Sequence, residues 1–277
     1  SVNCPNLIGR DIYDEADGIG YIQAEGIRGL DCQQMIYGAH LDRARAVSTV
    51  GEWRRFTDAV FRIEDGRRRI QPGIALYIMR QTLRGLEVLH TAGFLHSDVK
   101  PSNLMVDRLG IVKLVDYGRA VRVNERTTFL LGTPLYMAPE IHRRAGGSIQ
   151  SDIYSVGLVG LELLRGEPLA DVQNLSEDEL LEVKLKLPDN LPALLPPHVR
   201  QNEDFLTLLR KFLDPDPENR YDTAEDAESV SEGLALLHKQ LTMLGIDSEY
   251  DRELQGYITK LFPEEKPDDD YYDEVLA

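Results

Sequence analysis

The chain has 277 residues, with 31 basic and 47 acidic side chains and a formal net charge of −16. This length is ample for a buried core in one large domain or two lobes. The acidic excess argues against nucleic acid and against an anionic membrane surface as partners. Cys4 and Cys32 are too few for a disulfide scaffold or a zinc site, so a cytoplasmic location is expected. The sequence shows no signal peptide and no apolar run of about 18 residues, so no membrane segment is expected.

The start of the chain predicts a β-hairpin. Strands are expected at residues 7–13 and 19–24, and the turn-forming residues 14–18 join them. A hairpin of two strands is marginally stable in water, and its free edges favour association. We therefore expect another segment to complete this sheet.

The next part of the chain predicts two helices. Apolar side chains at helical spacing indicate a helix at 50–63, and a longer helix is expected at 73–91 with a buried apolar stripe. Three consecutive arginines, residues 67–69, lie between the two helices. We interpret this run as a solvated loop, in preference to a phosphate-binding patch.

Two loops that carry acidic residues follow the second helix. Residues 96–103 read His-Ser-Asp-Val-Lys-Pro-Ser-Asn, and residues 116–118 read Asp-Tyr-Gly. The apolar run at 111–115 predicts a strand between them, so both loops flank one short hairpin. Such an arrangement suits phosphoryl transfer, in which a protein positions groups, offsets charge and holds Mg²⁺ through oxygen ligands.

This stretch resembles the catalytic core of eukaryotic-type Ser/Thr protein kinases. The resemblance implies that Asp98 accepts the proton of the substrate hydroxyl and that Lys100 reaches the transferring phosphate. It further implies that Asn103 and Asp116 bind magnesium, and that Tyr117 replaces the Phe of the family's Asp-Phe-Gly. The implied cofactors are ATP and Mg²⁺, and the implied partner is a protein substrate with Ser or Thr.

Residues 132–140, Gly-Thr-Pro-Leu-Tyr-Met-Ala-Pro-Glu, resemble the substrate-docking segment of the same family. The resemblance implies that Thr133 is part of the catalytic site and forms hydrogen bonds with Asp98 and Lys100. A small-molecule phosphotransferase shares the catalytic acids but has no need of such a segment.

Three further residues have implied structural roles. Glu140 is expected to be buried against Arg220, because a buried carboxylate needs a charged partner. Asp152 resembles the acid that accepts backbone N–H groups from the catalytic loop. Its place near the start of a helix predicts an N-cap equally well.

The resemblance places the nucleotide between two lobes. Ala24 falls at the gatekeeper position, Glu25 and Ile27 fall where backbone groups contact adenine, and Met105 and Val115 fall on the floor of the pocket. Each of these five residues fits a role in a strand or in the core equally well.

The chain departs from the family in two ways. Regulated members have Arg at the position of Ser97, where it meets a phosphate on the activation segment. Since Ser cannot pair with a phosphate, catalysis is expected not to depend on phosphorylation of Thr127 or Thr128. The second departure is that no Gly-rich loop, small-lobe Lys or helix Glu precedes Cys4, so the sequence is interpreted as a fragment.

Helices are expected at 151–165, 176–185, 203–213 and 223–241, with a proline-rich connector at 187–201. Glu162 lies where some kinases contact an arginine of the substrate, which hints at basic substrates, although a solvated glutamate is the favoured interpretation. Residues 262–277 contain seven acidic residues against one lysine. This tail is interpreted as solubilising, with docking of a partner or autoinhibition as the alternatives.

The predicted fold class is α+β, a protein-kinase-like fold of two lobes with a mostly helical large lobe and a truncated small lobe that contains β-strands. The expected domains are a small-lobe remnant at 1–27, a large lobe at 28–241 and a C-terminal extension with the acidic tail at 242–277. The predicted function is transfer of the ATP γ-phosphate to Ser/Thr hydroxyls of proteins, with little turnover by this chain alone. The alternative is a catalytically weak pseudokinase or scaffold that binds partner proteins.

Overall fold

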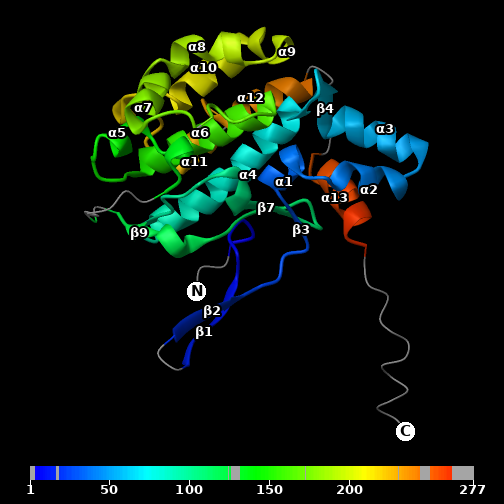
Figure 1. The fold of residues 1–277 in the computed structure, drawn as a ribbon, viewed down its shortest axis with the longest axis horizontal. Coiled ribbons are helices and arrows are strands. Elements are labelled where there is room, and N and C mark those ends of the chain that lie inside the picture. The colour runs from blue at the N-terminus through cyan, green and yellow to red at the C-terminus, as the bar shows by residue number, and fades with distance from the viewer. Residues whose placement is uncertain are drawn as a thin grey trace.

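The computed structural model describes residues 4–16, 19–123, 125, 132–171, 173–229, 231–243 and 250–263. Helices make up most of these residues, and the strands among them form small antiparallel sheets (Figure 1). The predicted α+β class with a mostly helical large lobe is therefore confirmed.

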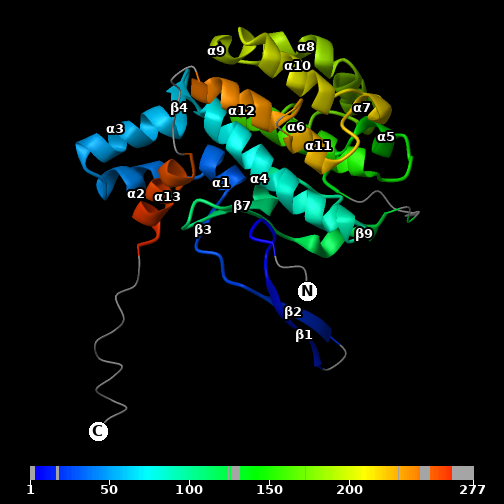
Figure 2. The same cartoon turned by 180° about the vertical axis from the view of Figure 1, so that it is seen from behind.

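Two long helices, α4 (Pro72–Thr91) and α6 (Ile149–Arg165), pack against each other in the centre of the core. The apolar stripe predicted for the helix at 73–91, which is α4, is fully buried at Leu76, Met79, Leu83 and Leu86. Gly160 on α6 permits a close approach, because a Cβ atom there would lie 2.4 Å from the sulfur of Met79. From behind, α11 and α12 lie along α4 (Figure 2).

A three-stranded sheet lies beside α4 and supports the two acid-bearing loops. Its strands, in the order β3-β7-β8, are Gly29–Asp31, Leu104–Asp107 and Val112–Leu114. The strand predicted within 111–115 is thus β8. Leu7 adds a parallel bridge to Leu114 at the outer edge of this sheet. Asn6, which is buried, donates hydrogen bonds to Gln81 on α4 and to the carbonyl of Val112.

The predicted N-terminal hairpin is present, with different limits for its first strand. β1 (Arg10–Ala16) pairs with β2 (Ile19–Ala24), and Ala16 stands opposite Ile19. The strand predicted at 7–13 is wrong at its start, because Leu7 bridges β8 and β1 begins at Arg10. The turn predicted at 14–18 begins too early, because Asp14 still pairs with Tyr21. Both views show the hairpin projecting away from the helices (Figures 1 and 2).

Residues 29–71 form a helical region followed by a second hairpin. Its elements are α1 (Cys32–Tyr37), α2 (His40–Ala46), α3 (Val50–Ala59), β4 (Phe61–Glu64) and β5 (Arg67–Ile70). The helix predicted at 50–63 is wrong at its end, because Asp65 and Gly66 both have positive φ angles and turn the chain into a hairpin. Ile63, expected on the apolar face, is therefore on β4 and half exposed.

The three arginines do not form a solvated loop, and that prediction is wrong. They lie on β5, where Arg68 donates hydrogen bonds to the carbonyls of Met35 and Gly38. Arg69 is buried and donates to the carbonyl of Arg165. The guanidinium groups are thus used to hold α1 and α6 to this hairpin.

After residue 138, every described element is a helix. The helices are α5 (Pro139–His142), α7 (Glu177–Leu185), α8 (Leu187–Leu194), α9 (Pro197–Arg200), α10 (Glu203–Phe212), α11 (Ala224–Glu228), α12 (Leu234–Met243) and α13 (Tyr250–Leu261). The connector predicted at 187–201 is wrong, because Pro188 and Pro197 stand in the first turns of α8 and α9, and Pro192 lies inside α8. The single helix predicted at 223–241 is also wrong, since the chain leaves the helix after Glu228 and begins another at Leu234.

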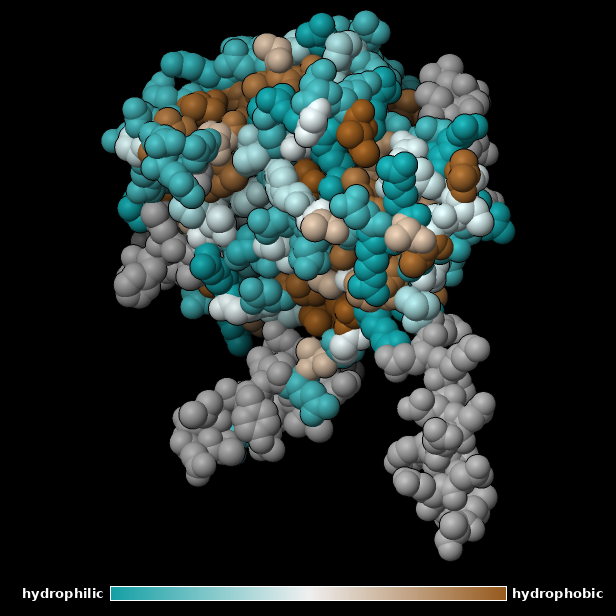
Figure 3. Space-filling view, turned by 45° about the vertical axis from the view of Figure 1, so that its right-hand side comes forward, coloured by the Kyte–Doolittle hydropathy of each residue, from teal (hydrophilic) through white to brown (hydrophobic). Residues whose placement is uncertain are grey.

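The last described helix belongs to the C-terminal extension expected at 242–277. α13 packs against α2, α3, α4 and β7, so this helix is part of the folded body. The tail residues 264–277 lie outside the described residues. Among the described helices, none is both long enough and apolar enough to cross a membrane. Hydrophilic side chains predominate on the face drawn in Figure 3, as expected for so charged a chain.

Candidate active site

The loop at 96–103 follows the short strand β6 (Phe94–Leu95), which pairs with β9 (Val121–Arg122). Within it, the Lys100 ammonium lies 2.7 Å from Oδ2 of Asp98. The Thr133 hydroxyl donates to Oδ1 of Asp98 at 2.8 Å and accepts from Lys100 at 3.1 Å. The contacts predicted for Thr133 are confirmed. Asn103 donates to the backbone carbonyl of Asp98 at 2.9 Å, so all four predicted catalytic side chains lie together.

Asp152 holds the backbone of this loop. Its two carboxylate oxygens accept hydrogen bonds from the N–H groups of His96 and Ser97, at 2.8 and 2.9 Å. The predicted contact with the loop is confirmed, whereas the N-cap prediction is wrong because Ser148 caps α6. Burial acts to raise the pKa of Asp152, but the hydrogen bond and charge of His90 outweigh it, and the pKa is lowered. The carboxylate is therefore ionised at neutral pH, as its acceptor role requires.

His96 links the loop to the end of β8, a role that the sequence did not reveal. Its Nδ1 accepts the N–H of Asp98, so Nε2 carries the proton and donates to the carbonyl of Val115 at 3.1 Å. Burial lowers the pKa of His96, which favours this neutral form. The His96 ring also meets the edge of Tyr117, whose hydroxyl donates to Leu114.

Asp116 and Asn103 are the predicted metal ligands. Asp116 has a left-handed backbone (φ 61°) and accepts the N–H of Gly118, and its side chain is exposed to solvent. Asn103 uses its amide nitrogen for Asp98, which leaves its amide oxygen for a cation. Within the described residues, no three His, Cys, Asp or Glu side chains are placed to bind a metal. Two oxygen ligands, completed by phosphate oxygens and water, nevertheless fit Mg²⁺.

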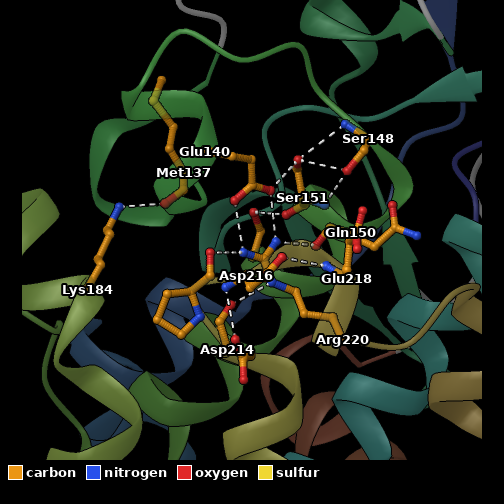
Figure 4. A network of polar contacts seen from close by, with 12 residues as sticks. Met137, Glu140, Ser148, Gln150, Ser151, Lys184, Asp214, Asp216, Glu218 and Arg220 are labelled. Carbon is orange, nitrogen blue, oxygen red and sulfur yellow. Dashed lines mark hydrogen bonds and ion pairs between the residues drawn. The ribbon is translucent and has the colours of Figure 1, made fainter.

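The segment at 132–140 lies directly against the loop at 96–103, the catalytic loop. Gly132 is required there, because its φ is 113° and a Cβ atom would lie 2.6 Å from the carbonyl oxygen of Ser97. Glu140 is buried and forms two hydrogen bonds of 2.8 Å with Arg220, as predicted (Figure 4). Ser151 on α6 donates a further bond to Glu140. The end of the segment is thus tied to α6 and to the region after α10.

Comparison with known proteins agrees with this geometry. Residues 47–236 match the model of the family described as "Protein kinase domain". The chain belongs to this family. It is 36% identical over 155 residues to serine/threonine-protein kinase STE20 of Saccharomyces cerevisiae. These residues cover 53% of this chain and 16% of that protein. Over 156 residues it is 33% identical to serine/threonine-protein kinase dst2 of Dictyostelium discoideum, with 54% of this chain and 13% of that protein covered.

A bacterial relative shows a similar match. Serine/threonine-protein kinase PknA of Mycobacterium tuberculosis is 39% identical over 136 residues, which cover 46% of this chain and 30% of that protein. In each of the three relatives the match spans less than a third of the relative's own length. This protein kinase domain therefore corresponds to only part of those proteins.

The five residues that the kinase resemblance assigns to the nucleotide fall into two groups. Met105 lies on β7 and Val115 directly follows its neighbour β8, and Val115 donates its N–H to the carbonyl of Asn103. Ala24 is the last residue of β2, and Glu25 and Ile27 lie on the connection from β2 to β3.

Glu25 is engaged within the protein. Its N–H donates to the carbonyl of Gly9, so any backbone contact with adenine falls to its carbonyl oxygen. Its side chain binds Lys113 on β8 at 2.7 Å, and this hydrogen bond lowers the pKa of the Glu25 carboxyl.

Glu162 is not the solvated residue that the sequence favoured. It is buried on α6, where it accepts hydrogen bonds from Tyr37 at 2.9 Å and Tyr136 at 2.7 Å. Burial raises the pKa of this carboxyl. Because two tyrosines cover it, Glu162 is not presented to an arginine of a substrate in this conformation.

A separate cavity of about 730 Å³ lies between α3, α4, α10 and α13. Arg54, Arg62 and His198 line it together with Phe205 and Tyr250. None of the predicted site residues lines this cavity, so it is distinct from the site around Asp98. Thr127 and Thr128, whose phosphorylation is expected not to be needed, lie outside the described residues.

Proposed function

We propose that this chain is the catalytic region of a Ser/Thr protein kinase, which transfers the γ-phosphate of ATP to Ser or Thr hydroxyls of proteins. The observation that carries the proposal is the contact of Asp98 with both Lys100 and Thr133. Membership of the protein kinase family supports the use of ATP and Mg²⁺ in general. The relatives, which are serine/threonine-protein kinases by name, support the choice of substrate hydroxyl.

In this proposal Asp98 is the general base. A substrate hydroxyl donates its proton to the Asp98 carboxylate while its oxygen attacks the γ-phosphorus, and the bond from that phosphorus to the β-phosphate breaks to release ADP. Lys100, whose ammonium lies beside that carboxylate, offsets the negative charge of the phosphoryl group as it transfers. Thr133 fixes the orientation of the carboxylate and joins it to the segment on which the peptide would lie.

Asn103 and Asp116 are the proposed ligands of Mg²⁺. When bound, the ion supplies charge that neutralises the phosphate oxygens of ATP. Asn103 is held by the backbone of Asp98, so the metal ligand and the base are fixed in one loop. For the nucleotide we propose the backbone of Glu25 and Ile27 beside Ala24, with Met105 and Val115 beneath the base.

The proposed domains are those expected for a kinase: a small-lobe remnant at 1–27, a large lobe at 28–241 and an extension at 242–277. We propose a cytoplasmic location, which the two free cysteines support. The proposed partners are Ser/Thr proteins. The net charge favours basic ones, although buried Glu162 does not support that preference.

A second candidate function is a pseudokinase that binds partner proteins. The observation that favours it is the β1–β2 hairpin, which forms a two-stranded sheet of its own among the described residues. Unpaired strand edges of this kind accept a strand from another chain. A strand from a partner would then complete the sheet.

The experiment that separates the two is calorimetric titration of ATP in the presence and absence of Mg²⁺. We expect Mg²⁺-dependent binding by the wild-type chain, and loss of binding in Asp116→Asn. Asp189→Asn, an exposed aspartate on α8, is the matched control and should bind like wild type. Folded wild-type protein that binds no ATP would contradict the kinase proposal and favour the scaffold.

A further inference from the structure

Lys184 on α7 is completely buried, which is rare for lysine. Its ammonium donates hydrogen bonds to the backbone carbonyls of Pro134 and Met137, both at 2.6 Å. It also lies 2.9 Å from Nε2 of His142 on α5 (Figure 4 shows the bond to Met137). An ammonium group has three donors and no acceptor, so these three neighbours satisfy it completely.

The two carbonyls belong to the segment that follows Thr133. A 3₁₀ turn at Pro134–Tyr136 leads from Thr133, which contacts Asp98, to Met137. Lys184 holds both ends of this turn from a helix about 50 residues further along the chain. The shape of the turn therefore depends on a long-range contact as well as on its own backbone bond, from the N–H of Tyr136 to Thr133.

From these contacts we propose that Lys184 is a positioning residue that shapes residues 134–137 for the binding of a peptide substrate. The proposal rests on the proposed kinase function, because that function makes this segment a peptide-docking surface. No motif of the sequence pointed to Lys184, which stands in an ordinary acidic helix. Its importance follows only from where the fold places it.

The charged groups around Lys184 make its contacts depend on pH. On α5, His142 touches it and Glu140 attracts it from a longer distance. On α7, Glu177 faces Nδ1 of His142 at 3.5 Å and also lies near Arg144. Burial lowers the pKa of Lys184 to about 7 and also lowers the pKa of His142.

The two protonation states of Lys184 need different tautomers of His142. Protonated Lys184 donates to Nε2, so Nδ1 of His142 carries a proton that faces the carboxylate of Glu177. Neutral Lys184 keeps two donors for the carbonyls, but its lone pair then requires a proton on Nε2. Nδ1 would in that case present a lone pair to Glu177, which is unfavourable. The three contacts are therefore strongest when Lys184 is charged, and they weaken as the pH rises through about 7.

The first test follows the methyl group of Met137 by NMR as the pH is changed. In wild type we expect its resonance to shift with a midpoint near pH 7, and in Lys184→Met we expect no shift. His142→Gln removes the histidine titration and should still show the shift, because Lys184 still loses its charge beside the carbonyl of Met137. Lys186→Met, an exposed lysine on the same helix region, is the control and should behave like wild type. A Met137 shift that persists in Lys184→Met, or that disappears in His142→Gln, would overturn the proposal.

The second test separates positioning from a general loss of structure. Binding of a serine peptide with flanking arginines is measured by fluorescence anisotropy, and ATP binding by calorimetry on the same samples. Lys184→Met should weaken peptide binding about tenfold, the factor that loss of one charge-assisted hydrogen bond corresponds to. ATP affinity should stay within about twofold of wild type.

Each outcome of these measurements has a defined meaning. If folded Lys184→Met binds both ligands as wild type does, Lys184 does not position the segment. If peptide and ATP binding fall together, its role is general stability and the proposal is wrong. If wild type binds neither ligand, the kinase function itself fails, while the Met137 titration still decides whether Lys184 controls the segment. If Lys184→Met does not fold, the Met137 titrations of wild type and His142→Gln are compared, and they decide whether Lys184 controls the segment.

Discussion

The catalytic loop and the β1–β2 hairpin flank the same proposed nucleotide site, but different contacts hold them. Buried side chains fix the loop: Asp152 binds its backbone, and Arg220 binds the segment that follows. The hairpin is joined to the body by the backbone bond from the N–H of Ile8, just before β1, to the carbonyl of Leu114, and by the partly exposed contact of Glu25 with Lys113. Buried polar pairs cost far more to break than exposed ones. The loop at 96–103 and the segment at 132–140 therefore form a platform that buried contacts hold, whereas the hairpin beside the proposed nucleotide site depends on a partly exposed side-chain contact.

The largest effect expected from this difference is on catalysis. In a form of the protein that turns over ATP, Asp98→Asn should reduce kcat by a factor of about 10²–10⁴, because the amide cannot accept the hydroxyl proton. ATP binding should remain, since Asp98 is not a proposed metal ligand. Steady-state kinetics and calorimetry measure both quantities, and Asp189→Asn serves as the control. A variant that keeps full kcat would show that another group is the base.

Breaking the buried pair behind the docking segment should have the next largest effect. Arg220→Met leaves the buried Glu140 carboxylate without its guanidinium, which should lower the free energy of unfolding by about 3–5 kcal/mol. Urea denaturation measures this loss. Arg200→Met, an exposed arginine on α9, should change it by less than about 0.5 kcal/mol. Equal losses of unfolding free energy in the two variants would show that the buried pair is no more important to stability than an exposed arginine.

The pH dependence of stability should carry the signature of Asp152. Because its pKa is lowered below 3.8 in the folded state, it contributes stability above that pH, and the contribution is lost as the pH falls through the folded pKa. Asp152→Asn should be less stable than wild type at pH 7, and the difference should shrink below about pH 4. Denaturation curves at a series of pH values measure this. A difference that stays constant down to pH 2 would contradict the ionised anchor.

A much smaller effect is expected on the hairpin side. Lys113→Met should cost about 0.2–1 kcal/mol of unfolding free energy, because Glu25, its partner, is more than one third exposed. A double-mutant cycle with Glu25→Gln isolates the coupling between the two side chains. A coupling comparable to that of Arg220 with Glu140 would mean that the hairpin is held as firmly as the loop.

The sequence predicted the platform well because its contacts lie within an ordered set of motifs. The positions of Thr133, Glu140 and Arg220 followed from that order, and the long helix α4 followed from its apolar period. The hairpin at 61–70 was missed even though Asp65-Gly66 is a strong turn signal. Apolar residues that also fit a helical period outweighed that signal.

The buried charges could not be predicted from the sequence. Lys184 and Glu162 look like ordinary polar residues of helices, and only tertiary packing places one under the docking segment and the other beneath two tyrosines. The break between α11 and α12, in contrast, could have been predicted from the sequence. Ser229, Ser231 and Gly233 are turn-forming residues, and a Cβ atom at Gly233 would lie 2.5 Å from the carbonyl oxygen of Ala227.

The smallest effect, an absence of change, is expected from the threonines before Gly132. Ser97 donates its N–H to Asp152, and its carbonyl lies against Gly132, so the loop is ordered without a phosphate. A serine side chain also offers no positive charge for a phosphate to bind. Replacing both Thr127 and Thr128 by alanine should therefore leave kcat within about twofold of wild type in an active form of the protein. Loss of activity in a folded double variant would show that the platform needs phosphorylation after all, and that its internal contacts are not sufficient.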